Sequence, residues 1–200
     1  MKLVPLLVVA GLTLTASHID AQVSKSRAAG FFLGGGLEGD GVKEETPIAK
    51  DRSGGGGGVV VGYGFNQRWS LFSQFGVAQV TSPDFPDHRY AFGHLDLGAR
   101  VHFRTGPNAV VPFLQFGVTG RTELDDVAGV GFSSTGAGLS LGGGFNAHFT
   151  PSVALSTAAT WTFGNFDSFK VDGATVERDP FKVTTARIHI GVVWFINNRH

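Results

Sequence analysis

Apolar and polar residues alternate along most of the chain after residue 22. In the stretch from 94 to 104, the odd-numbered positions are apolar and the even-numbered positions are polar or glycine. Successive side chains of a β-strand point to opposite faces, so this stretch predicts a strand that separates two different environments. The pattern recurs about eight times, and a helical period is not sustained in this part of the chain.

The alternation predicts eight strands within one domain, residues 22–200. They are expected at about residues 28–38, 56–65, 68–80, 90–104, 109–121, 134–149, 152–164 and 183–195. The connections between them are alternately long and short. In an up-and-down sheet this order places all long loops at one end and all tight turns at the other, as in outer-membrane barrels.

The composition of the two faces predicts how the sheet closes. One face consists of Leu, Val, Phe, Ile and Trp, and the other mainly of Gly, Ser, Ala and Thr with a few charged residues. A soluble ligand-binding barrel is the alternative, but its exterior would carry many Lys and Glu residues. Small residues also suit a narrow lumen. Because Arg100 on the lipid face would cost about 2–4 kcal/mol, we expect an eight-stranded antiparallel transmembrane β-barrel with its polar face inside.

The N-terminal residues 1–21 predict a cleaved signal peptide. Lys2 precedes an apolar run of about 12 residues, which is too short for a membrane helix but suits a signal peptide. Ala21 provides the small residue expected at the cleavage position. A membrane-anchored N-terminus is the alternative interpretation.

The overall composition excludes several classes of protein. The chain of 200 residues has no cysteine, which excludes thiolate metal sites and disulfide scaffolds. Its 16 basic and 16 acidic residues balance, so nucleic acid is not an expected partner. The segment Gly34–Gly39 matches GxGxxG, but no helix follows it, and we do not expect a dinucleotide site.

The chain also resembles a known family. The residues that carry this resemblance are the alternating segments, the turn within GYGFNQRWSLF (62–72) and a closing strand that ends in VVWF (192–195). Over about Ala28 to Phe195, the chain is similar to the small outer-membrane β-barrel proteins related to the OmpA transmembrane domain. The resemblance implies a bacterial outer-membrane location, contact with outer-membrane lipid and insertion by the barrel-assembly machinery. One departure is that Ile196–His200 follow Phe195, where such barrels often end on an aromatic residue.

Polar residues on the inner face are predicted to form a lumen network. Its predicted members are Glu38, Asp96, Arg100, His102, Arg104, Arg121, His148, Arg187 and His189. Because charges are costly in a dry interior when unpaired, we expect Asp96 to pair with Arg100 or Arg187, and Glu38 to pair with Arg121. His94 shares a face with Asp96, and such groups could bind a metal. We favour a hydrogen-bonded network, and predict no metal and no cofactor.

Aromatic residues gather near both ends of the predicted strands, which is typical of interfacial girdles. At the short-turn end these are Phe65, Trp69, Phe103, Phe149, Trp194 and Phe195. At the long-loop end they are Tyr90, Phe92, Phe132 and Phe163.

The expected function is a non-enzymatic structural or surface-interaction role, with the long loops outside the cell. The alternative is a narrow channel for ions or small solutes, in which the lumen arginines would give a mild anion preference. A third possibility is a lipid A-modifying enzyme, which would need a serine, a histidine and an acid near the lipid interface. Most histidines fall instead on the predicted lumen face. The loop sequences identify no extracellular ligand.

Overall fold

The computed structural model describes residues 29–45, 51–82, 85–103, 110–127 and 129–196. The predicted signal peptide lies outside these residues. The strands are β1 (Gly30–Glu44), β2 (Arg52–Gly64), β3 (Trp69–Ser82), β4 (Phe85–His102), β5 (Val110–Val127), β6 (Val130–His148), β7 (Val153–Val171), β8 (Ala174–Val176) and β9 (Phe181–Ile196). The described residues include no helix long and apolar enough to cross a membrane.

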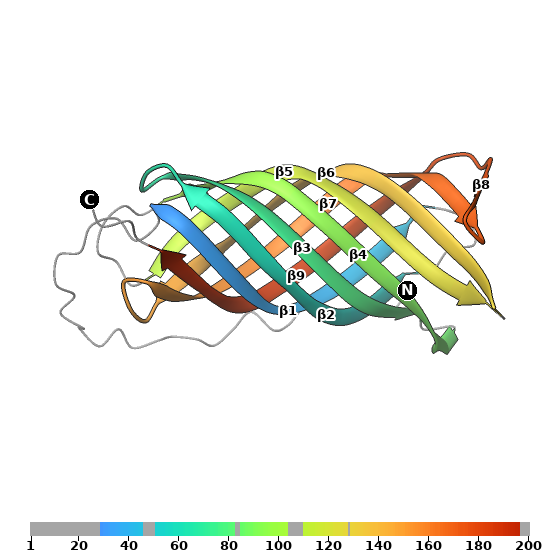
Figure 1. Ribbon diagram of the computed structural model, residues 1–200, viewed down its shortest axis with the longest axis horizontal. Helices are drawn as coiled ribbons and strands as arrows, with labels where there is room; N and C mark the ends of the chain where they lie inside the picture. Colours follow the sequence, from blue (N-terminus) through green and yellow to red (C-terminus); the bar gives the residue numbers. More distant parts are fainter. Residues whose placement is uncertain (1–28, 46–50, 83–84, 104–109, 128, 197–200) are drawn as a thin grey trace, which may run out of the picture.

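Eight of the strands, β1–β7 and β9, form a closed antiparallel barrel (Figure 1). Strands β1 to β7 each pair with the next along the chain, and β9 lies between β7 and β1 to complete the ring. Every pairing is antiparallel, which confirms the predicted up-and-down barrel. A closed ring leaves no unpaired sheet edge, as a membrane interior requires.

The strands extend further at the long-loop end than predicted. β5 ends at Val127 rather than at 121, and β7 ends at Val171 rather than at 164. β4 and β6 likewise begin earlier than predicted, at Phe85 and Val130. The predicted strand ends rested on the alternation of apolar and polar residues. A strand that has left the lipid does not need this alternation. Backbone pairing continues there with polar side chains.

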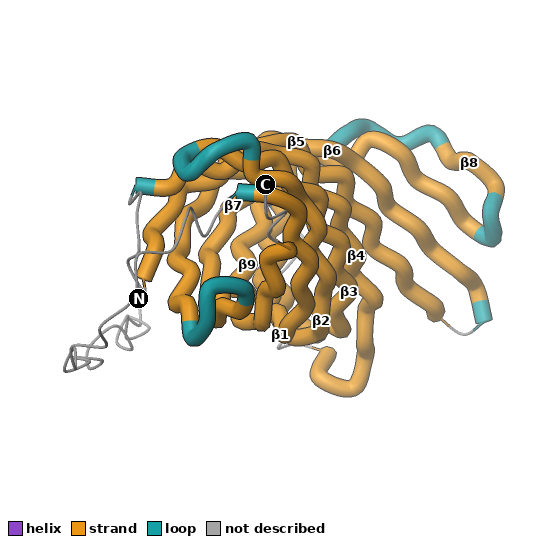
Figure 2. Tube along the Cα trace, turned by 60° about the vertical axis from the view of Figure 1, so that its left-hand side comes forward, coloured by secondary structure: helices purple, strands orange, loops and turns teal. Residues whose placement is uncertain are grey.

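The longest predicted loop contains an additional hairpin. The three-residue strand β8 pairs with the end of β7 and takes no part in closing the barrel. Figure 2 shows this hairpin extending past the end of the barrel. Asp172 and Gly173, both with positive φ, form its turn. This end of the molecule therefore presents an ordered sheet extension.

The outer face of the barrel carries large apolar side chains. Leu37 and Leu139 expose 76% and 69% of their surfaces, and all three tryptophans of the chain are also exposed. The buried residues on the inner face include many charged and polar groups. This distribution is the reverse of a soluble protein, whose large apolar residues are mostly buried.

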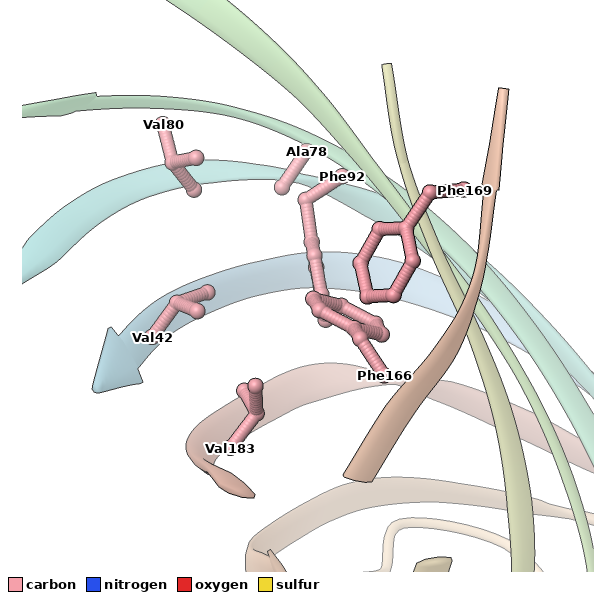
Figure 3. Packing of buried hydrophobic residues seen from close by; sticks show 7 residues of the cluster. All are labelled: Val42, Ala78, Val80, Phe92, Phe166, Phe169 and Val183. Carbon is pink, nitrogen blue, oxygen red and sulfur yellow. The ribbon is translucent and has the colours of Figure 1, made fainter. Parts of the chain in front are cut away.

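Two hydrophobic clusters lie inside the barrel, one near each end. The turn-side cluster consists of Phe32, Val60, Phe72, Ala154, Val193 and Phe195. The loop-side cluster consists of Val42, Ala78, Val80, Phe92, Phe166, Phe169 and Val183 (Figure 3). The centre of the lumen, with Glu38 on β1 and Arg187 and His189 on β9, lies between these two clusters.

Three residues predicted to lie in the aromatic girdles, Tyr90, Phe92 and Phe195, point into the barrel instead, so these predictions are wrong. Phe195 and Phe92 are only 2% and 1% exposed and belong to the two internal clusters, and Tyr90 packs against the loop-side cluster. Trp194 points outward, so strand alternation requires its neighbour Phe195 to point inward. Phe92 lies on the same face of β4 as the buried Asp96.

Two glycines of β1 provide a test of the close packing of the wall. A Cβ added at Gly36 would collide with the backbone of Ile190 and Gly191, whereas one added at Gly39 meets nothing within 4 Å. We expect Gly36→Ala to destabilise the barrel by about 1–3 kcal/mol through overpacking. Gly39→Ala should be neutral or slightly stabilising. Urea unfolding in lipid vesicles, followed by tryptophan fluorescence, measures both. Equal stabilities would contradict this packing.

Candidate functional site in the barrel lumen

The lumen holds the predicted polar network, in which Arg100 and His148 pack against aromatic residues of the turn-side cluster. Its buried predicted members are Glu38, Asp96, Arg100, His102, Arg121, His148, Arg187 and His189. Arg104 lies outside the described residues. His94, predicted to share a face with Asp96, also belongs to the network. The predicted set left out the hydrogen-bonding residues Ser70, Gln74, Gln115, Thr119, Thr160 and Thr162. These residues all fall on the inner face of the alternation, which could have identified them.

Asp96 and Arg187 form a buried ion pair across the lumen. Arg187 donates from Nη1 to Asp96 Oδ2 at 2.7 Å and from Nη2 to Asp96 Oδ1 at 2.9 Å. Thr119 also donates to Asp96, and Arg187 contacts the Nδ1 of His94. Of the two partners considered for Asp96, the structure selects Arg187. The two-point geometry fixes both side chains.

Glu38 is surrounded by neutral donors and imidazoles. Gln74 Nε2 donates to its Oε1 at 2.6 Å, and His94 Nε2 lies 2.8 Å from its Oε2. His189 Nδ1 lies 3.3 Å from Oε1. Gly58 and Gly76 make room for the carboxylate, because a Cβ on either would collide with it. The network therefore joins β1, β3, β4 and β9.

The predicted pairing of Glu38 with Arg121 is wrong. Arg121 donates from Nη1 to the carbonyl of Val183 at 3.0 Å, and its guanidinium carbon lies 5.5 Å from the centre of the Phe166 ring. It is thus directed to the loop-side cluster. Glu38 instead extends over Gly58 of β2 and Gly76 of β3, which leave space for its carboxylate, and reaches His94 on β4.

Arg100 is held mainly by aromatic rings. Its guanidinium carbon lies 4.5 Å from the ring centre of Phe72 and 4.7 Å from that of Phe113. Its Nε donates to Gln115 Oε1 at 3.0 Å, and Gln115 in turn donates to Thr160. Such cation–π contacts stabilise a guanidinium group that is buried away from water. They also account for Phe72, which interrupts the small-residue pattern of the inner face.

The mouth of the barrel at the long-loop end contains a second charged group. Arg52 bonds to Glu44 and, at 2.9 Å, to Glu123, and its guanidinium carbon lies 4.9 Å from the ring centre of Tyr90. Glu123 points inward on β5, beyond Gly120 and Thr122, which interrupt the large outward-facing residues between Val118 and Leu124. Burial raises the pKa of the Glu123 carboxyl, and Arg52 opposes that rise. A cleft of about 360 Å³ opens beside these residues.

The remaining girdle residues lie on the outer face. Phe65, Trp69, Phe103, Phe149 and Trp194 are each between 45% and 71% exposed near the short-turn end. Phe132 and Phe163 are exposed toward the long-loop end. Aromatic side chains at both ends of an apolar band are typical of membrane–water interfaces.

The arrangement defines the class of protein. A closed barrel with an apolar exterior, aromatic ends and a polar interior is an integral membrane β-barrel. The family of outer membrane protein beta-barrel domains matches residues 6–194, and the chain belongs to that family. The protein is therefore an integral β-barrel protein of the bacterial outer membrane.

Solved structures of outer-membrane barrels share this fold. Neisserial surface protein A is 17% identical over 84% of this chain and 98% of that chain, with a TM-score of 0.67. OprG from Pseudomonas aeruginosa is 14% identical over 86% and 98%, with a TM-score of 0.59. Ail of Yersinia pestis is 17% identical over 84% and 99%, with a TM-score of 0.56. A comparison with curated protein sequences gives no match.

Proposed function

We propose that this protein is a closed, non-conducting barrel with a structural or surface-interaction role. The observation that carries the proposal is the packing at both ends of the lumen. Phe32, Phe72 and Phe195 fill the turn side, and Phe92, Phe166 and Phe169 fill the loop side. Ion pairs and hydrogen bonds occupy the layer between them. Barrels of eight strands are commonly filled by their own side chains.

Planar-bilayer conductance tests the closed lumen. The protein is refolded in detergent, and only material whose gel mobility shifts on boiling is used, because this shift marks the folded barrel. We expect silent bilayers. Reproducible small conductance steps would instead favour the narrow channel, and an anion preference in those steps would point to the lumen arginines.

The ordered sheet extension at the long-loop end is the proposed interaction surface. It includes the β7–β8 hairpin and the cleft beside Arg52, Tyr90 and Glu123. One similar barrel, Ail, was solved with the heparin analogue sucrose octasulfate, so heparin is the first probe. Cells that display the wild type are compared on a heparin-coated surface with cells that display a variant in which a short Gly-Ser turn replaces residues 170–180. Weaker retention of the variant would support this surface, and equal retention would contradict a heparin-binding role for the hairpin.

A non-enzymatic role is part of the proposal. The four histidines whose side chains are described, His94, His102, His148 and His189, are all buried in the lumen. Within that part of the chain, none can act as a base at the lipid interface. Mass spectrometry of lipid A from an expressing strain should show no change relative to an empty-vector control. A new lipid A species would contradict this part of the proposal.

We also propose that the barrel-assembly machinery inserts the protein into outer-membrane lipid.

A further inference from the structure

The carboxylate of Asp40, two residues after Glu38 on the same strand, is buried without a hydrogen-bonding partner in the part of the chain that the structure describes. Asp40, on β1, is 4% exposed. Within the described residues, neither of its carboxylate oxygens has a hydrogen-bond partner. Arg187 lies opposite Asp40 in the β1–β9 ladder, but its guanidinium is bonded twice to Asp96. A buried carboxylate without a partner is costly, and such a group is commonly paired or bound to a metal.

Asp40 lies beside two further groups that can ligate a metal. One ligand atom each from Glu38, Asp40 and His94 all lie within 4.8 Å of one another, and the three residues are buried. A zinc ion binds carboxylate oxygen and imidazole nitrogen at about 2.0–2.2 Å. Small side-chain rotations would therefore bring the three atoms to one ion. We propose that Glu38, Asp40 and His94 form a binding site for a divalent transition metal inside the lumen.

The surroundings of His94 support this assignment. Its Nε2 faces Glu38, and its Nδ1 lies 3.3 Å from Asp96 Oδ2. Binding of the ion through Nε2 requires the ring hydrogen on Nδ1, so Nη1 of Arg187, which contacts Nδ1 in this structure, then moves off it and keeps its bond to Asp96. Nδ1 then donates to Asp96, and Nε2 presents its lone pair to the ion. Metal-bound histidines usually have such an outer carboxylate, which fixes the ring orientation. Arg187 holds Asp96 in place from the opposite side.

Charge and space are consistent with a bound divalent cation. The two carboxylates of Glu38 and Asp40 would balance its charge of about +2. Gly76 leaves open the space between the ligands, because a Cβ at this position would collide with both Glu38 Oε2 and His94 Nε2. The imidazole ligand favours Zn²⁺ and similar ions over Mg²⁺, which prefers oxygen ligands.

The test uses the untagged full-length chain, refolded in the presence of Zn²⁺ so that the packed ends of the lumen do not limit access. Heat-modifiable protein is separated from free metal, and its metal content is measured by mass spectrometry. We expect about one zinc ion per chain for the wild type. Asp40→Asn should lower this content by about tenfold or more. Glu123→Gln, which removes a buried carboxylate at the mouth, is the matched control and should retain the wild-type content.

A second pair of variants leaves every ligand in place. Gly76→Ala should lower the zinc content as Asp40→Asn does, whereas Gly120→Ala, whose added Cβ meets nothing within 4 Å, should leave it unchanged. Refolding in Mg²⁺ should give no retained metal. The proposal is overturned if folded wild type retains no zinc, or if Asp40→Asn retains as much zinc as wild type. The second outcome would place the bound zinc elsewhere on the chain.

Discussion

Replacing Arg187 with leucine is expected to destabilise the folded barrel by about 3–5 kcal/mol, because it leaves the Asp96 carboxylate buried without its cation. Both side chains are only 4% exposed, and the two hydrogen bonds between them are lost together. Urea unfolding in lipid vesicles, followed by the heat-modifiable gel band and by tryptophan fluorescence, measures the change.

Two further variants separate the ion pair from a general effect of losing an arginine. Arg89→Leu removes an exposed arginine with one long hydrogen bond, and should change the free energy of unfolding by less than about 0.5 kcal/mol. The double variant Asp96→Leu/Arg187→Leu should recover much of the loss, because it removes the Asp96 charge that Arg187→Leu alone leaves unpaired. If Arg187→Leu is no less stable than Arg89→Leu, the lumen network has been assigned incorrectly.

Replacing Leu97 with arginine should destabilise the barrel in a bilayer by about 2–4 kcal/mol, because it places a charge in the hydrocarbon. Leu97 is 52% exposed and lies on the outer face of β4, opposite Val118 of β5. Three residues further along the same strand, Arg100 is tolerated because it points inward. Vesicle unfolding curves of wild type and Leu97→Arg give the difference in the free energy of unfolding.

Ala137→Arg is the depth control for this experiment. Ala137 is also exposed, but it lies beyond Phe163 of the long-loop girdle, between the small or polar ladder neighbours Gly120 and Asn165. An arginine near the interface should cost only about 0–1 kcal/mol. If Leu97→Arg and Ala137→Arg both changed the free energy of unfolding by the same small amount, the outer face would be in contact with water. That result would contradict a lipid-facing exterior.

The strands that cross the membrane could be predicted from sequence because lipid and lumen impose opposite demands on alternate residues. The alternation in β4 and β9 identified the inward direction of Asp96, Arg100 and Arg187. Outside the lipid this constraint disappears, so the outer strand ends and the β8 hairpin were missed. Asp40 was left out because β1 was predicted to end at 38.

Side-chain partners in the lumen were harder to predict than side-chain direction. Alternation places Glu38 and Arg121 inside, but whether they meet depends on strand stagger and on the space left by Gly58 and Gly76. Aromatic residues were ambiguous for a related reason. Phe195 and Phe92 serve equally well as interfacial anchors and as filling for the lumen, and only strict alternation distinguishes the two roles.

The large apolar face of the barrel is expected to be in contact with lipid. The tryptophans Trp69, Trp161 and Trp194 are all between 45% and 57% exposed on this face. Their fluorescence in vesicles of brominated lipid therefore tests the claim directly, because bromine quenches only tryptophans close to the acyl chains. We expect strong quenching in single-tryptophan variants at all three positions, with Trp161 most sensitive to bromines placed deep in the chains. Fluorescence that brominated lipid leaves unchanged in folded, heat-modifiable protein would contradict the account.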